Sequence, residues 1–292
     1  MTADPIPAIR EEEAVGDTAE IFADLRATLG LPFVNLIWRH LATVPGALQA
    51  VWPAVRPLYL TAELAARSAG IGAGARPGGV EPVPREAWSA LGVDEVARRD
   101  VAGLVDAYNR ANSTNFLVFT TIDVLVRGGR GPGGRARTGN GDTAPVAVPV
   151  AAPAAAFPPL PPMDALSPDL QALVLACDEL GRLGASAAHA SLYRHLALWP
   201  PFLATAYVAL SPLHRSGALQ AAQRDLIEVA RSAVVDELVP LLPQARLAVD
   251  DDVRARIGPV VEEFATIMIG RMVVAGAVMR ALLPDPDDHA AG

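Results

Sequence analysis

Histidine is a common general acid or base near neutral pH, and the five histidines of this chain differ in their surroundings. His40 and His195 each follow an arginine directly, in two segments of matching sequence. Because the same residue occurs in both segments, we expect a scaffold role in which each ring bonds a backbone carbonyl. His189 has no such counterpart and lies in a run of small residues just before a predicted helix. It is therefore the histidine that stands apart.

A polar segment at 108–115, Tyr-Asn-Arg-Ala-Asn-Ser-Thr-Asn, comes directly before the apolar run 116–119. Burying amides without partners is costly, so polar groups within an apolar helix need an explanation. One interpretation is an exposed turn of the helix. The other is a set of hydrogen-bonding side chains aimed into a pocket. The segment itself leaves both open.

The familiar catalytic and binding motifs are absent. The sequence contains no G-x-S-x-G, no G-x-x-x-x-G-K-[ST], no G-x-G-x-x-G after a strand and no H-E-x-x-H. Its single cysteine, Cys177, lies in an apolar run, which predicts a small buried side chain and excludes an internal disulfide. We therefore expect neither a cofactor nor a metal.

Composition narrows the class of partner. Hydrophobic residues make up 51% of the 292 residues and charged residues 19%, which is typical of a globular protein. A net charge of −8 and aromatic residues at only 5% argue against nucleic acid as the partner. The apolar stretch 266–283 is interrupted by Arg271 and Arg280, so we expect no membrane span. The acidic N-terminus resembles no signal peptide, and we expect a cytoplasmic protein.

Helical spacing and capping signals dominate, and they predict an all-α fold. Ser167-Pro168 is typical of a helix start, while Gly30 and Gly184 each follow a predicted helix. Alternating apolar and polar runs of the strand type are nearly absent. Any catalytic side chain must therefore be positioned by helices and the loops between them.

The chain also resembles itself. The segment 38–42, Trp-Arg-His-Leu-Ala, returns as Tyr-Arg-His-Leu-Ala at 193–197, and two apolar helices, 105–126 and 261–282, match at an offset of 156 residues. This order predicts two tandem helical repeats that fold as an intrachain pseudo-dimer, each covering the other's apolar face. We place the first repeat at 1–127, a Gly/Arg-rich and then Pro/Ala-rich linker at 128–162, and the second repeat with a short tail at 163–292.

Several segments together resemble a known family. They are Leu-Pro-Phe-Val at 31–34, Arg-x-Leu-Ala-Thr-x-Pro-Gly at 39–46, Tyr-Asn-x-x-Asn at 108–112 and the two parts of 190–200, Ala-Ser and Leu-Ala-x-Trp-Pro. In this order they are similar to the DL-2-haloacid dehalogenases of the DehI type, over nearly the whole chain apart from linker and tail. The resemblance implies an all-helical, cofactor-free hydrolase that acts on small 2-substituted carboxylic acids, with its site between the repeats, and assembly as a homodimer. It also implies that an aspartate activates a water molecule, which displaces the halide with inversion and without an ester intermediate, from either enantiomer.

The resemblance also assigns site residues. Pocket-wall positions of the family fall on Phe33, Leu36 and Phe264, where Phe264 replaces a tyrosine. The family's asparagine falls on Asn112 and its serine on Ser191, and both are retained.

The family's catalytic aspartate falls on Leu192, whose alkyl side chain cannot accept a proton. No acid adjoins it in sequence, since Asp178 and Glu179 belong to the preceding helix. His189 is the nearby residue able to act as a substitute base. Three hypotheses follow: a hydrolase with altered chemistry, a non-catalytic relative that keeps the carboxylate-binding pocket, and a structural scaffold.

Overall fold

The computed structural model describes residues 6–128, 157–186, 188–242, 247 and 249–284, and within these ranges the chain is helical and contains no strand. The predicted all-α class is confirmed. The expected linker, 128–162, lies mostly outside the described residues. The first half contains the 3₁₀ turns η1 (Glu11–Glu13) and η2 (Arg56–Leu60) and the helices α1 (Gly16–Leu29), α2 (Leu36–Leu41), α3 (Ala47–Val55), α4 (Ala62–Gly74), α5 (Arg85–Ala90) and α6 (Glu95–Val126).

The described part of the second half is helical as well. It contains the 3₁₀ turns η3 (Met163–Ala165) and η5 (Val239–Leu241), the π-helical turns η4 (Val234–Leu238) and η6 (Phe264–Met268), and the helices α7 (Pro168–Glu179), α8 (Ser191–Leu196), α9 (Pro200–Arg215), α10 (Ala218–Ala233), α11 (Asp251–Glu263) and α12 (Ile269–Ala281). The predicted start of α7 is confirmed, because Ser167 caps it by accepting from the Leu170 amide and Pro168 occupies its first turn.

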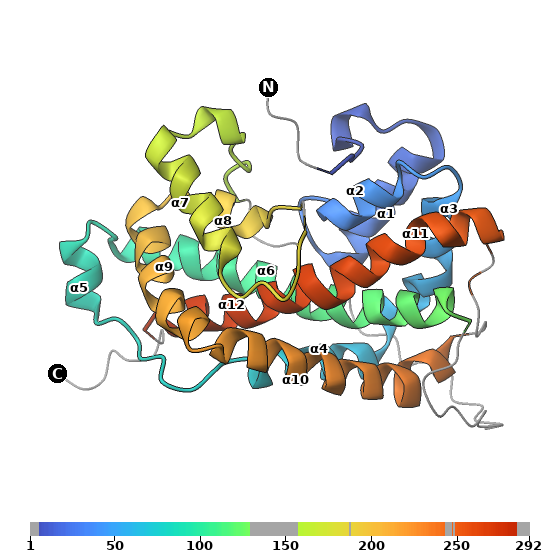
Figure 1. Cartoon of the computed structure of the whole chain (residues 1–292). Helices are drawn as coiled ribbons and strands as arrows, with labels where there is room; N and C mark the ends of the chain where they lie inside the picture. The colour runs from blue at the N-terminus through green and yellow to red at the C-terminus, as the bar shows by residue number, and fades with distance from the viewer. Residues whose placement is uncertain (1–5, 129–156, 187, 243–246, 248, 285–292) are drawn as a thin grey trace.

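Helix α6 and the continuous run α11–η6–α12 cross the middle of the molecule side by side (Figure 1). They are antiparallel, because Asp106 on α6 pairs with Arg280, whereas Arg127 just beyond α6 pairs with Glu262. Both runs begin on an aspartate cap: Asp94 accepts from the Ala97 amide, and Asp250 accepts from the Val253 amide. An acceptor at this position satisfies an amide that the first helical turn leaves unpaired.

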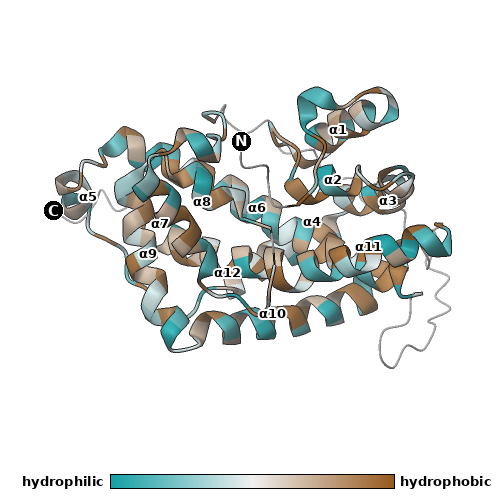
Figure 2. Cartoon of the chain, turned by 45° about the horizontal axis from the view of Figure 1, so that its top comes forward, coloured by the Kyte–Doolittle hydropathy of each residue, from teal (hydrophilic) through white to brown (hydrophobic). Residues whose placement is uncertain are grey.

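The remaining helices surround this central pair. Helices α1, α2 and α3 cover one end of it and α7, α8 and α9 the other, while α4 and α10 lie along a third side (Figure 1). Helix α10 alternates between apolar and polar positions along its length (Figure 2), and its buried residues recur at helical spacing on one face. The largest buried side chains include Trp38, which packs edge-on against Trp52 with ring centroids 5.4 Å apart.

The run from 251 to 281 is long and apolar enough to cross a membrane by length and composition alone. In the folded chain, however, 72% of its most apolar window is buried within the protein. Its apolar side chains are covered by neighbouring helices, chiefly α6 and α10. The run is a core helix, as the two interrupting arginines suggested.

His40 and His195 make the backbone contacts that the sequence predicts. Nδ1 of His40 lies 2.6 Å from the carbonyl oxygen of Pro7, and Nε2 of His195 lies 2.8 Å from that of Pro158. Each ring thus holds a loop segment, at Pro7 or Pro158, against its own helix, α2 or α8. The two contacts occupy equivalent places in the two matching sequence segments.

Candidate functional site

The centre of the molecule contains an inner cavity of about 70 Å³ between the two halves of the chain. Six of the seven side chains that the sequence assigns to a site line this one cavity: Leu36, Asn112, His189, Ser191, Leu192 and Phe264. Helices α2 and α6 supply one wall, while α8, the loop before it and the region of η6 supply the other. The polar segment 108–115 is therefore not simply an exposed turn, because Tyr108, Asn112 and Asn115 face this cavity.

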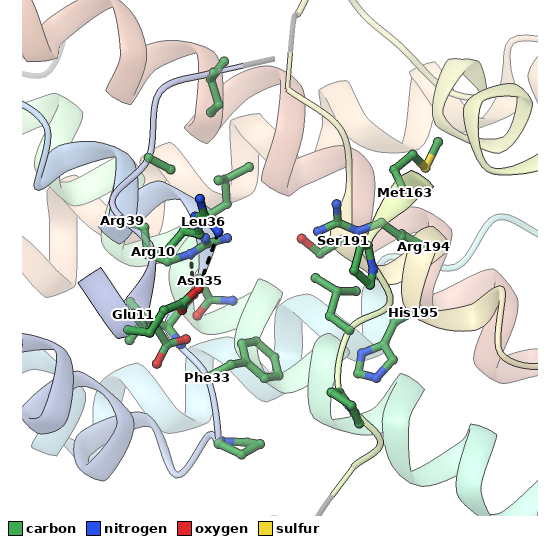
Figure 3. Close-up of a pocket in the computed structure, with 18 of the residues that line it drawn as sticks. Arg10, Glu11, Phe33, Asn35, Leu36, Arg39, Met163, Ser191, Arg194 and His195 are labelled. Atoms are coloured by element: carbon green, nitrogen blue, oxygen red, sulfur yellow. Dashed lines mark hydrogen bonds and ion pairs between the residues drawn. The ribbon is translucent and has the colours of Figure 1, made fainter. Parts of the chain in front are cut away.

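A larger outer chamber of about 910 Å³ adjoins the inner cavity. Figure 3 shows its two sides facing each other, with Arg10, Glu11, Phe33 and Arg39 from the first half and Met163, Arg194 and His195 from the second. Phe33, the seventh predicted side chain, lines this chamber and not the inner cavity. Four residues, Asn35, Leu36, Tyr108 and Ser191, line both spaces, and we call them the throat.

Tyr108 is held firmly at the throat. Its ring lies 5.4 Å from that of Phe33, and its hydroxyl lies 3.3 Å from Nδ1 of His195. A carbonyl can only accept, so His195 donates from Nε2 to Pro158, and Nδ1 accepts from Tyr108. Burial lowers the pKa of His195 and keeps its ring neutral, consistent with this arrangement. His195 thereby fixes one side of the throat.

The loop residue His189 is anchored by the most enclosed carboxylate of the site, Asp178, which is 1% exposed. Nδ1 of His189 lies 2.9 Å from Oδ2 of Asp178, and the Ala190 amide donates to Oδ1 over 3.0 Å. Two guanidinium groups complete the environment, Arg271 at 2.8 Å and Arg182 at 2.7 Å. All four partners donate to the same side chain.

The charge state of Asp178 follows from these contacts. Burial by itself would raise its pKa, but the hydrogen bond from His189, the charge of Arg271 and the further donors outweigh burial and lower the pKa to about 2. Asp178 is therefore an anion at neutral pH and can only accept. In the neutral form of His189, the proton must therefore lie on Nδ1, which faces Asp178, and Nε2 keeps a free lone pair.

Asp178 is the important residue that sequence reasoning missed. In the sequence it belongs to the helix before the site, and the sequence predicts that this helix continues to Gly184. This expectation is wrong: α7 ends at Glu179, and the chain turns back through Gly181, whose φ of 76° suits glycine. Arg182 bridges the loop by donating to the carbonyl of Ser186, so His189 returns to the end of α7.

Known proteins were found that resemble this chain in sequence or in structure. No family model matches the chain. A curated (R)-2-haloacid dehalogenase from Pseudomonas putida is 40% identical over 55 residues, which is 18% of this chain and 18% of the relative. The structure of a D-2-haloacid dehalogenase mutant with D-2-CPA matches over 95% of this chain and 96% of its own, with a TM-score of 0.72 and 19% identity. The structure of D-2-haloacid dehalogenase with L-LA gives a TM-score of 0.74 at 20% identity over the same shares.

The chain has the fold of the D-2-haloacid dehalogenases. The sequence resemblance to DehI-type 2-haloacid dehalogenases is thereby supported by two independent comparisons, one of sequence and one of structure. The sequence match spans less than a fifth of either protein. Only the structural match, which shows the fold, extends over nearly the whole chain.

Within the dehalogenase fold, the wall around Leu192 is apolar. Leu192 is 1% exposed and lines the inner cavity together with Phe264, Met268 and Met272. Among the described residues that line this cavity there is no aspartate or glutamate. The cavity's ionisable side chains are thus Tyr108, whose pKa is raised by burial, and His189.

A local irregularity in the helix shapes the apolar wall of the inner cavity. Phe264 opens η6, a single π-helical turn inserted between α11 and α12. Such turns hold one extra residue and often occur at functional sites. Here the turn brings both Phe264 and Met268 to the cavity. Within the described residues, no group of three or more His, Cys, Asp or Glu side chains is placed to hold a metal ion.

Proposed function

We propose that this protein hydrolyses small 2-halocarboxylic acids in the inner cavity, with His189 as the base that activates water. The observation that carries the proposal is the contact of 2.9 Å between His189 Nδ1 and buried Asp178, at the wall of a cavity in a dehalogenase fold. A ring held in this way presents Nε2 as an acceptor, which is what a general base requires.

In the proposed reaction a water molecule attacks carbon 2 of the acid. The oxygen–carbon bond forms as the carbon–halogen bond breaks, and the halide leaves with the bonding electrons. The water's proton passes to Nε2 of His189 and then to solvent, so the products are a 2-hydroxy acid, halide and a proton. Asp178, whose pKa is lowered to about 2, remains an anion and stabilises the protonated ring without taking its proton.

The other residues assigned from the sequence shape and polarise the cavity. Asn112 and Ser191 supply an amide and a hydroxyl able to hold the water or a carboxylate oxygen. Leu36, Leu192 and Phe264 give an apolar lining that excludes bulk water, and Phe33 continues this lining outside the throat. An apolar environment strengthens the remaining electrostatic contacts around the reacting atoms.

The test is release of chloride from D- and L-2-chloropropionate by purified protein. We expect turnover of at least one enantiomer, and a fall of about two to four orders of magnitude in kcat for His189→Asn, which can still donate toward Asp178 but cannot accept a proton. His40→Asn is the matched control, because His40 bonds Pro7 outside the cavity. Equal turnover by the His189→Asn variant and the parent would contradict the assigned base.

A second candidate is a non-catalytic protein that binds small carboxylic acids. It is favoured by Leu192, a buried hydrocarbon at the position of the family's aspartate. No chloride release by the parent protein, together with binding of 2-chloropropionate, would select this candidate. A pure scaffold is favoured less, because open space is retained around Asn112 and Phe264.

We also infer that the two halves are repeats forming an intrachain pseudo-dimer, and that the protein is a cytoplasmic homodimer. The repeat is supported by the paired aspartate caps and by the two histidine–carbonyl contacts. The homodimer rests on the resemblance alone, and light scattering of the purified protein tests it. Superposition of the two halves in an experimental structure tests the repeat.

A further inference from the structure

Two arginines lie beside the throat, one from each half of the chain. Arg39 on α2 and Arg194 on α8 occupy matching places in the segments 38–42 and 193–197, and both line the outer chamber (Figure 3). Both are close enough to the buried hydroxyl of Tyr108 for their charges to oppose the rise in its pKa that burial causes. Since Tyr108 lines both spaces, the two cations flank the passage between them.

The charge of Arg39 has no carboxylate beside it. Its Nε donates to the carbonyl of Val34 over 3.2 Å, and within the described residues its guanidinium forms no ion pair with a carboxylate. A guanidinium left without an anion at the mouth of a cavity is suited to a ligand that brings one.

The acids of the outer chamber are engaged elsewhere or lie in solvent. Glu11 accepts from Arg26 and from the Val34 amide, and Glu13 pairs with Arg10. Glu12 is 71% exposed, and Asp164 is also exposed. In the described part of the chain none of these carboxylates pairs with Arg39, so the throat keeps positive charge.

We propose that the throat is a carboxylate-binding subsite, in which Arg39 and Arg194 hold the acid group of a short monocarboxylate with its second carbon in the inner cavity. What happens to that carbon rests on the proposed function, whereas binding of the carboxylate does not. Ser191 and Asn35 at the throat offer further polar groups to the same carboxylate. The small inner cavity has room for only a few water-sized groups, so a halogen and a short alkyl group fit and a long chain does not.

The test is calorimetric titration with propionate, which carries no leaving group, and with propionamide, which has the same shape without the charge. We expect the wild type to prefer propionate. We expect Arg39→Gln to weaken propionate binding about tenfold to a hundredfold and to leave propionamide unchanged, because a charge-assisted hydrogen bond is lost. Arg39→Lys should recover part of the affinity, since it keeps the charge but not the planar donors.

The matched control is Arg110→Gln, which removes one charge from α6 on a face away from the chamber. Thermal unfolding of each variant reports whether it is folded. Equal affinity of the wild type for propionate and propionamide, or unchanged propionate binding in Arg39→Gln, would overturn the subsite. Propionate binding without chloride release from 2-chloropropionate would support the subsite and reject the proposed dehalogenation. Chloride release from 2-chloropropionate with an unchanged KM in Arg39→Gln would support the proposed dehalogenation and reject the subsite.

Discussion

His189 and Asp178 are eleven positions apart in the sequence, yet Nδ1 of the first lies 2.9 Å from Oδ2 of the second. The same carboxylate accepts from the Ala190 amide at the start of α8 and from Arg271 on α12. One buried side chain therefore joins a loop and two helices, and its loss should be felt in stability as well as in chemistry.

Asp178→Asn should destabilise the fold by about 3–5 kcal/mol, because it leaves the buried guanidinium of Arg271 without its anion. Urea unfolding followed by circular dichroism measures this. Glu179→Gln is the control, since the neighbouring Glu179 side chain is 67% exposed and should change the free energy of unfolding by less than about 0.5 kcal/mol. A similar loss in both variants would show that the Asp178 contacts contribute nothing specific.

Stability should fall with acidification in the range set by Asp178. Folding lowers the pKa of this group from 3.8 to about 2, so between these values the unfolded chain binds more protons than the folded one. The stabilisation is complete above about pH 4 and is lost as the pH falls through 2, on the order of 2 kcal/mol in total. Carbon-13 NMR of the Asp178 carboxyl follows the titration directly. A midpoint at or above 3.8 would contradict the assigned contacts.

Leu192→Asp should place a carboxylate in the inner cavity beside Asn112 and Ser191. We expect faster chloride release from 2-chloropropionate, with an inflection in the pH–rate profile above the usual aspartate range, because the apolar wall raises the pKa of the new acid. Leu192→Asn is nearly isosteric with this change and lacks the charge. If the asparagine variant gains as much activity as the aspartate variant, a new base is not the cause.

Gly276→Ala should destabilise the protein by about 1–3 kcal/mol. A β-carbon at this position would collide with Oδ1 of Asn109, whose Nδ2 donates to the Gly276 carbonyl between α6 and α12. Gly70→Ala on α4 is the matched control, since its β-carbon meets nothing and should stabilise the helix by about 0.5–1 kcal/mol. Thermal unfolding of both variants measures the difference, and equal shifts would rule out close packing at Gly276.

The fold class was predictable because its signals are local. The cap at Ser167, the left-handed Gly30 after α1 and the apolar spacing of 105–126 each depend on a few neighbouring residues. The extent of the central helices was less predictable. Their first turns, from Glu95 and from Asp251, are rich in charged residues, so apolar spacing alone starts each helix too late.

The candidate site was predictable in its walls and not in its chemistry. Leu36, Asn112 and Phe264 could be placed from the resemblance, since each matches a position in a sequence pattern. Asp178 could not, because its importance depends on a turn at Gly181 that returns the chain to the end of α7. One signal was present: Asp178 stands four residues after buried Val174, on the side of the helix that faces the core.

The π-helical turn η6 also determines whether the central helix tolerates the deletion of a residue. An added residue in the middle of a helix rotates everything beyond it by about 100° while keeping the axis. As a result, α11 presents one set of side chains to the end of α6, where Gly258 meets Val126, and α12 presents an independently phased set, where Gly270 meets Phe116. Deleting one residue within 264–268 would give α11 and α12 one continuous helical register. The contacts of Gly258 and Gly270 with α6 could then no longer be made together.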